Sequence, residues 1–268
     1  MKRLAGALAA LLLVMACVYT YKLEAPETRS YPASGIARLS ASSKNGKVTV
    51  ADVSDTLISA TITRQAYGRN KADAEKAIAN VVISDPVVGN EQQLKADMPG
   101  GNRNYGASFE ISCPAATGLA LATSNSEVTV TGMTGGISAT TSNGRIGLTD
   151  TRGAASLVTS NAAVDVAVHR GGVNAHTSNA AVSCDLAELG ATEAVTLATS
   201  NGAVTLLLPA DVSATVDVTT SSGLITINDF TVSYDVQESD HVRGRIGSGA
   251  SAITISTSNG NVTVRRRS

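Results

Sequence analysis

One short phrase, Thr-Ser-Asn followed by alternating apolar residues, recurs along the second half of this chain. Its Asn residues are Asn125, Asn143, Asn161, Asn179, Asn201 and Asn259. The first four are spaced 18 residues apart, and the later gaps are longer. A variant copy, Thr220-Ser-Ser-Gly223, lies between the last two, and a degenerate copy begins at Ser43. Fixed periods of this length are typical of solenoids, in which each repeat buries its apolar face only against its neighbours.

The pattern inside each repeat identifies the kind of solenoid. Apolar residues follow the Asn at the third and fifth positions and precede it at the fourth, as Val128, Val130 and Leu121 do around Asn125. A spacing of two with β-branched residues predicts strands, whereas a helical repeat needs spacings of three and four. We therefore expect an all-β fold: a single-stranded, right- or left-handed, β-helix-like solenoid with coils of 18–22 residues. Coils stack about 4.8 Å apart, so equivalent residues form columns.

The Thr and Asn columns are expected to be structural. Stacked Asn side chains at a corner hydrogen-bond to one another and to the backbone, so the six Asn residues above predict an Asn ladder. An outward Thr column would be suited to binding ice or a polymer surface. Thr123, however, falls in phase with Leu121, Val128 and Val130, which predicts that the Thr side chains point inward.

One segment departs from the strand pattern. Asn70 is a helix-capping residue, and apolar residues with helical spacing follow it up to Val82. We expect a short helix near residues 70–82 that covers the open end of the solenoid or lies along its side, since exposed sheet edges need cover. Strands are also expected over Gln93–Met98 and Gly106–Cys113, joined as a hairpin.

The N-terminus has the features of a secretion signal. Lys2-Arg3 precedes an apolar run, Leu4 to Ala16, that is shorter than the roughly 20 residues of a spanning helix. The run ends in Val14-Met-Ala-Cys17, which resembles a bacterial lipobox and predicts a lipid on Cys17. Ordinary cleavage with secretion and an uncleaved anchor are the alternatives. Val18, rather than Asp, after Cys17 favours the outer membrane, so the expected location is the envelope, as an outer-membrane or periplasm-facing lipoprotein.

These features divide the chain into four parts. They are a signal peptide over residues 1–17, a Pro-containing tether over 18–34, a β-solenoid over 35–264 and a basic tail over 265–268. The tail is expected to block edge-to-edge strand pairing, with binding of an anionic glycan or lipid as the alternative. Cys113 and Cys184 lie about four coils, or roughly 19 Å, apart on this scheme, too far for a disulfide. Both are predicted to be unpaired.

Several sequence features together resemble the "putative adhesin" domain-of-unknown-function family of bacterial envelope proteins. They are the repeated Ser-Asn-Gly-x-Val-x-Val phrases, Phe109-Glu-Ile-Ser-Cys-Pro114, and Gly244-Arg-Ile-Gly-Ser-Gly249. The resemblance covers about residues 35–264. It implies the solenoid architecture and brings no catalytic residues with it.

The composition and the polar residues argue against an enzyme, a metal site and a nucleic-acid partner. Net charge is −1 and aromatic residues make up 3% of the chain, so there is no basic footprint for nucleic acid. The acids of the regular coils do not recur in one column as a pair or cluster; they are Glu127, Asp150, Asp165, Asp185, Glu188 and Glu193. His169, His176 and His241 lack metal-ligand spacing and are expected to be solvated. No cofactor, metal or catalytic residue is predicted.

The function expected from these features is that of a non-enzymatic, lipid-anchored, adhesin-like envelope protein. Its partners would be the membrane, through the N-terminal lipid, and an envelope glycan or protein. A rigid envelope spacer or scaffold is the first alternative. A polysaccharide-acting β-helix enzyme is the second.

Overall fold

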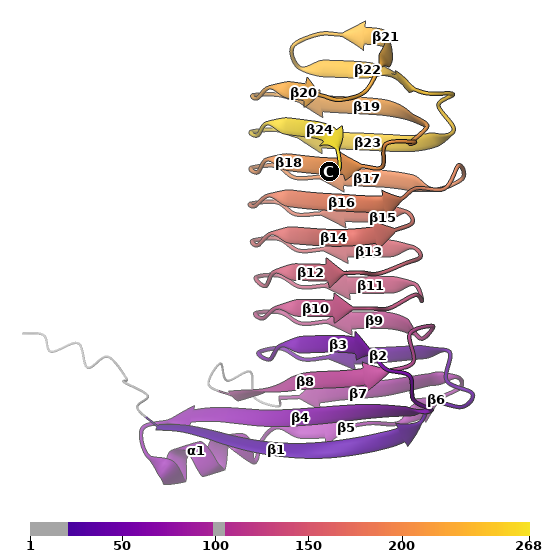
Figure 1. Cartoon of the computed structure of the whole chain (residues 1–268). Helices are drawn as coiled ribbons and strands as arrows, with labels where there is room; N and C mark the ends of the chain where they lie inside the picture. Colours follow the sequence, from indigo (N-terminus) through magenta and orange to yellow (C-terminus); the bar gives the residue numbers. More distant parts are fainter. Residues whose placement is uncertain (1–20, 99–104) are drawn as a thin grey trace, which may run out of the picture.

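The computed structural model describes residues 21–98 and 105–268 (Figure 1). The expected signal peptide and Cys17 lie outside these residues. Two long sheets of mostly parallel strands face each other and form one elongated stack of coils. The predicted β-solenoid is therefore confirmed.

Sheet A contains eleven strands. In spatial order they are β1 (Tyr21–Pro32), β4 (Leu57–Gly68), β8 (Tyr105–Cys113), β3 (Val48–Asp52), β10 (Val128–Thr131), β12 (Ile146–Thr149), β14 (Val164–Arg170), β16 (Val182–Glu188), β18 (Val204–Leu208), β24 (Val262–Arg266) and β20 (Ile225–Ile227). We call the end formed by β1 the base and the end formed by β20 the far end.

Sheet B contains thirteen strands. From the far end they are β21 (Val232–Gln237), β22 (His241–Ile246), β19 (Ala214–Thr220), β23 (Ser251–Thr257), β17 (Ala194–Ala198), β15 (Val173–His176), β13 (Ala155–Val158), β11 (Ile137–Thr140), β9 (Gly118–Ala122), β2 (Arg38–Ser42), β7 (Glu91–Asp97) and β5 (Val82–Ser84), with β6 (Val87–Val88) paired to β7.

Each regular coil contributes one strand to each sheet. The chain runs along a strand of sheet B, turns at a Thr-Ser-Asn corner and returns along a strand of sheet A. Neighbouring coils pair in register, so that Val128 lies beside Ile146 and Ile146 beside Val164. The 18-residue period of the sequence is thus the length of one turn of the stack.

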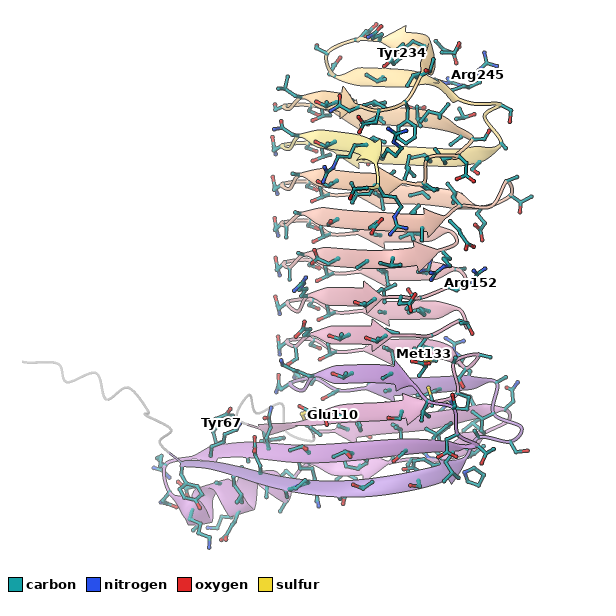
Figure 2. The ribbon with its side chains drawn as sticks, in the orientation of Figure 1. Tyr67, Glu110, Met133, Arg152, Tyr234 and Arg245 are labelled. Carbon is teal, nitrogen blue, oxygen red and sulfur yellow. The ribbon has the colours of Figure 1, made fainter. Side chains whose placement is uncertain are left out.

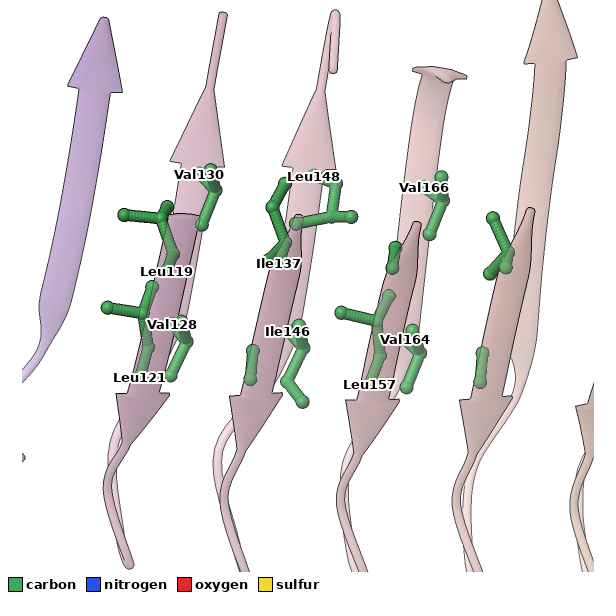
Figure 3. Close-up of a cluster of buried hydrophobic side chains, with 14 of the residues drawn as sticks. Leu119, Leu121, Val128, Val130, Ile137, Ile146, Leu148, Leu157, Val164 and Val166 are labelled. Carbon is green, nitrogen blue, oxygen red and sulfur yellow. The ribbon is translucent and has the colours of Figure 1, made fainter. Parts of the chain in front are cut away.

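The core lies between the two sheets as columns of fully buried aliphatic side chains. Figure 3 shows the side chains of sheet B, such as Leu121 and Leu157, facing those of sheet A, such as Val128 and Val164. Each Val or Leu removed from water in this way contributes about 1.5–3 kcal/mol. The narrow space explains why the regular coils use aliphatic residues and no aromatic rings.

The coils at the two ends are not stacked in sequence order. The β2–β3 coil lies between the β7–β8 pair and the β9–β10 coil. Similarly, the last coil, β23–β24, lies between the β17–β18 coil and the β19–β20 coil. At the far end the chain forms the outer strands first and then places β23–β24 in the slot that was left. At the base it forms β2–β3 after β1 and before the outer strands β4 to β8, and the regular coils follow from β9.

The predicted tether over residues 18–34 is wrong for most of its length, because Tyr21–Pro32 form β1. This strand pairs antiparallel with β4 from Tyr21–Gly68 to Pro32–Leu57. Its side toward the interior carries a polar network: the hydroxyl of Tyr31 donates to Asp85 at 2.7 Å, and Arg29 contacts both Glu27 and Asp85. The hydrogen bond from Tyr31, followed by the Arg29 charge, lowers the pKa of Asp85 despite partial burial.

Two further expectations are corrected. Residues 265–268 are not a free tail, since Arg265 and Arg266 belong to β24 and pair with Leu207 and Leu208 of β18. On the other side, β20 pairs with β24 only from Val262 to Val264, so the two arginines do lie beside an unpaired edge. Arg267 forms an ion pair with Asp185 at 2.9 Å. The strands β7 and β8 are not a hairpin, because they lie in different sheets.

The predicted helix is present as α1 (Lys71–Ile78). The Asn70 side chain accepts a hydrogen bond from the Asp73 backbone N–H at 2.9 Å, as expected for an N-cap. The helix packs against β4 and β1 at the base, where Ala74 is buried (Figure 1). Among the described residues, no helix has the length and apolar character needed to cross a membrane.

Cys113 and Cys184 are free and buried, which confirms that they are unpaired. Because the β2–β3 coil is inserted between them, five strand spacings rather than four separate β8 from β16. Burial raises the pKa of the Cys113 thiol to about 11, and it raises that of Cys184 as well. Both thiols are therefore poorly reactive.

The core columns generate a direct test. Val164 is fully buried, so Val164→Asp places a carboxylate where neither water nor a partner solvates it. We expect a loss of unfolding free energy of about 4 kcal/mol or more. Urea denaturation is the measurement, with Ser138→Asp on the exposed side of β11 as control. Equal stability of the two variants would contradict the assigned core.

Candidate interaction surface

The Thr residue of each corner points into the stack. Seven are buried: Thr123, Thr141, Thr159, Thr177, Thr199, Thr220 and Thr257. Each donates its hydroxyl hydrogen to a backbone carbonyl of a neighbouring coil, for example Thr159 to Gly144 at 3.0 Å and Thr177 to Ala162 at 2.9 Å. The inward orientation was expected from the phase of the repeat. The Thr side chains are therefore not part of an outer contact surface.

The Asn residues of the corners form a ladder on the outside of the stack. Asn143, Asn161, Asn179, Asn201 and Asn259 each donate from Nδ2 to the Oδ1 of the Asn one coil below, at 2.7–3.0 Å. Asn125 donates in the same way to Asn45 of the inserted β2–β3 coil. The structure therefore brings together all six Asn residues named from the sequence. Asn45 extends the ladder by one coil, because the degenerate copy of the phrase that begins at Ser43 forms the same kind of corner.

The outer face of sheet B is uncharged over six adjacent strands. No Asp, Glu, Lys or Arg occurs in β9, β11, β13, β15, β17 or β23. Most of its exposed residues are small and polar, and Val158 and His176 are exposed there as well. The small polar residues include Ser138, Thr140, Ser156, Asn174, Thr196 and Thr254. Six strands span about 24 Å along the stack. This flat surface, which we call the neutral face, is the candidate site for contact with a partner.

A shallow groove of about 580 Å³ crosses the neutral face and reaches Arg38 of the neighbouring strand β2 at one end. Small residues line it where the strands begin, including Gly118, Gly136, Ala154 and Gly172. A Cβ atom added to Gly136 would meet only the Ala154 carbonyl oxygen, at 3.8 Å. The groove thus exists because this column holds only glycine and alanine, and a larger residue at Gly136 would fill it without a backbone clash.

The outer side of sheet A differs, because charged residues lie across it in ion pairs. Arg145 contacts Asp165 at 2.7 Å, and Lys47 contacts Glu127 at 3.4 Å, in each case between adjacent coils. The Asp165 charge raises the pKa of Arg145, chiefly through their hydrogen bond. Exposed pairs of this kind are worth little stability but keep a surface hydrated. The two faces of the stack therefore present different chemistry.

The acidic residues of the regular coils are held by ion pairs and hydrogen bonds. Asp150 and Glu188 both contact Arg170, and the Glu193 carboxylate accepts a hydrogen bond from the Gly190 backbone N–H. Together with the ion pairs above, these contacts give each of the six acids named from the sequence a basic or backbone partner. Over residues 21–98 and 105–268, no cluster of three His, Cys, Asp or Glu side chains is arranged to hold a metal ion.

The three histidines lie in three different environments. His176 is exposed on the neutral face, and His241 contacts Asp217 at 3.0 Å. His169, expected to be solvated, is instead fully buried. A β-bulge at Val168, whose φ is 56°, reverses the strand alternation in β14 and turns His169 inward.

The contacts of His169 define its proton state. Its Nε2 lies 3.0 Å from the Gly153 carbonyl oxygen, which only accepts, so Nε2 carries the hydrogen. Its Nδ1 therefore accepts from the Thr151 hydroxyl at 2.8 Å. Burial lowers the pKa of His169 below its ordinary value, because the charged ring would lose its hydration.

This lowered pKa gives a pH dependence with a defined sign. The unfolded chain takes up a proton at His169 near the ordinary pKa of about 6.5, whereas the folded chain resists it. The contribution of His169 to the free energy of unfolding is thus fully present above that pH and is lost as the pH is lowered through it. Urea titrations from pH 8 to 5 should show a smaller decline for His169→Gln than for the wild type. His176→Gln is the control, and a wild-type slope in His169→Gln would contradict the argument.

The neutral face and its groove were not found from the sequence. The repeat pattern alone does not show which strands share a sheet, so it does not separate the outer residues of one sheet from those of the other. The signal was nevertheless present: six strand segments in the same position of the repeat contain no charged residue.

No curated protein sequence matches the chain. A solved "putative cell adhesion protein" from Clostridium sporogenes is similar at 13% identity and a TM-score of 0.41, over 91% of this chain and 100% of that chain. A "putative adhesin" from Bacteroides fragilis is similar at 13% identity and a TM-score of 0.39, over 90% of this chain and 97% of that chain.

A family model matches most of the sequence. The Toastrack DUF4097 model covers residues 30–265. This range includes every regular coil and both inserted coils, and it agrees with the resemblance expected from the repeated phrases. The chain therefore belongs to the Toastrack DUF4097 family.

Proposed function

We propose that this protein is a non-enzymatic, adhesin-like component of the bacterial cell envelope, anchored by a lipid on Cys17. In this proposal the neutral face of sheet B is the surface that contacts a partner in the envelope, either a glycan or a protein. The chain would act as a rigid support for that surface and not as a catalyst.

The observation that carries the proposal is the difference between the two faces. A rigid spacer, the first alternative, needs only a hydrated exterior, which sheet A has. The neutral face instead offers six strands of hydroxyl, amide and small apolar groups around a groove. Such a surface loses little hydration free energy on contact, and each exposed hydroxyl is available to donate and accept hydrogen bonds. Many weak contacts of this kind add up on an extended polymer.

The lipid anchor is tested by Cys17→Ala. We expect the wild type to carry a diacylglyceryl mass increment and to fractionate with membranes, and we expect the variant to lose both, because the thioether lipid has no other attachment point. Intact-mass measurement and membrane fractionation are the readouts. A soluble wild type cleaved near Ala16 without a lipid would contradict the anchor and leave secretion as the explanation.

The neutral face is tested by a matched pair of glycine substitutions. Gly136→Glu places a charged side chain in the groove of sheet B, while Gly147→Glu places one on sheet A, where a Cβ has no neighbour within 4 Å. Beads coated with full-length protein are incubated with peptidoglycan sacculi and with outer-membrane vesicles. We expect Gly136→Glu to weaken binding about tenfold, because a buried unpaired charge costs more than 1.4 kcal/mol.

The control in this experiment is binding by Gly147→Glu, which should equal that of the wild type. Equal binding by the wild type and both variants would show that the neutral face is not the contact surface. If the wild type itself binds neither preparation, the spacer becomes the better explanation.

A further inference from the structure

The first strand of the base begins four residues after the proposed anchor in the sequence. Tyr21 is the first residue of β1, and only Val18, Tyr19 and Thr20 separate it from Cys17 in the sequence. We propose that the base is a membrane-contacting surface, in which Tyr21, Tyr67 and Lys22 lie against the headgroups of a phospholipid bilayer. This inference rests on the proposed lipid at Cys17 and adds a protein surface to it.

Chain length limits the distance between the lipid and the fold. Four residue steps from Cys17 to Tyr21 span at most about 14 Å when fully extended. The headgroup layer on one side of a bilayer is itself about 5–7 Å thick. Tyr21 adds no further length to this linker, because it is paired with Gly68 at the start of an antiparallel ladder that extends to Pro32. A lipid on Cys17 therefore holds the corner of the base within or beside the headgroup layer.

The chemistry of this corner suits that layer. Tyr21 is 36% exposed and Tyr67 is 39% exposed. Tyr67 is paired with Lys22, whose Nζ lies 5.9 Å from the centre of the Tyr67 ring. Because Tyr21 is paired with the next residue, Gly68, the two tyrosines lie on opposite sides of the two-stranded end. Tyrosine favours the interface, where its ring is apolar and its hydroxyl stays hydrated, and a lysine beside it reaches phosphate groups.

Exposed apolar side chains are concentrated toward this end of the molecule. Of the ten large apolar residues exposed in the part of the chain that the structure describes, seven fall within residues 21–88. They are Tyr21, Val53, Leu57, Tyr67, Val82, Val87 and Val88. Figure 2 places Tyr67 where β4 extends beyond the coils above it. Leu57 is paired with Pro32, at the opposite end of β1 from Tyr21, so the bias belongs to the base as a whole and not to the corner alone. Exposed apolar side chains gathered at one end are typical of a surface that meets a partner or lipid.

The charges of the base identify the kind of bilayer. Lys22, Arg69 and Lys71 are cationic, but each contacts a carboxylate, on Glu24, Asp73 and Glu75 respectively. Of the cations on this corner and on α1, Lys76 alone has no carboxylate partner, so the described part of the base shows no cluster of unpaired cations of the kind that selects anionic lipids. We expect it to bind zwitterionic phosphatidylcholine vesicles and to tolerate salt. The far end then projects about 48 Å from the membrane, which is ten strand spacings of sheet A.

The test places a fluorophore beside the corner while keeping both tyrosines. Full-length acylated protein carrying Lys71→Cys is labelled with an environment-sensitive dye, since Cys113 and Cys184 are buried. It is then reconstituted in phosphatidylcholine vesicles that contain a headgroup-region quencher lipid. Ser233→Cys, on exposed β21 at the far end, is the matched label position. We expect several-fold stronger quenching at Lys71→Cys, and equal quenching at the two positions would overturn the inference.

A second pair of variants tests the tyrosine contact itself. In the Lys71→Cys background, Tyr67→Ser should reduce quenching, whereas Tyr234→Ser, which removes a tyrosine of similar exposure (42%) at the far end, should not. Unchanged quenching in Tyr67→Ser would show that Tyr67 is not part of the membrane-contacting surface. Intact mass of the same samples separates the two proposals: an unacylated chain overturns the anchor, whereas an acylated chain with an unquenched Lys71→Cys label overturns only the membrane contact.

Discussion

In-register stacking of parallel coils is the constraint on which the rest of this structure depends. Every coil must place the same kind of side chain above and below itself about 4.8 Å away, because the backbone ladder fixes that spacing. Groups that pair with their own kind are therefore selected at each position. Asn161 both donates to Asn143 and accepts from Asn179, and the buried Thr159 hydroxyl satisfies a carbonyl of the next coil. Each such bond is worth about 1 kcal/mol, and the repeat multiplies it.

The same constraint makes a surface as regular as the core. Since outward positions also form columns, a missing side chain at Gly136 is continued by small residues at Gly118, Ala154 and Gly172, and a groove results. Over the regular coils the charged strand residues lie on sheet A, where Arg145 and Asp165 neutralise each other between coils. A stack could tolerate charge on both faces. Its absence from six strands of sheet B is what makes that face suited to contact.

The sequence predicted those parts of the fold that depend on the repeat. Strand alternation, inward Thr, the Asn corners and the capped helix at Asn70 all follow from local patterns. The order of the end coils did not, because a β23–β24 coil inserted between two others has the same pattern as one added at the end. His169 was missed for a different reason: the bulge at Val168 reverses the alternation on which the prediction relied. The neutral face required knowing which strands share a sheet.

The assignment of β1 as a tether failed at the base, where the requirements of a solenoid change. An end strand has a neighbour on one side only, and inward charges protect such an edge from pairing with other chains. In β1, Glu27 and Arg29 occupy inward positions, and they are stabilised by contacts with Asp85 and Arg64. Because these inward residues are polar, β1 lacks the alternation of apolar and polar residues by which a strand is recognised in a sequence. β1 therefore both closes the stack and continues directly into residues 18–20 of the sequence. A lipid at Cys17 would then attach to the rigid fold itself and not to a long flexible linker.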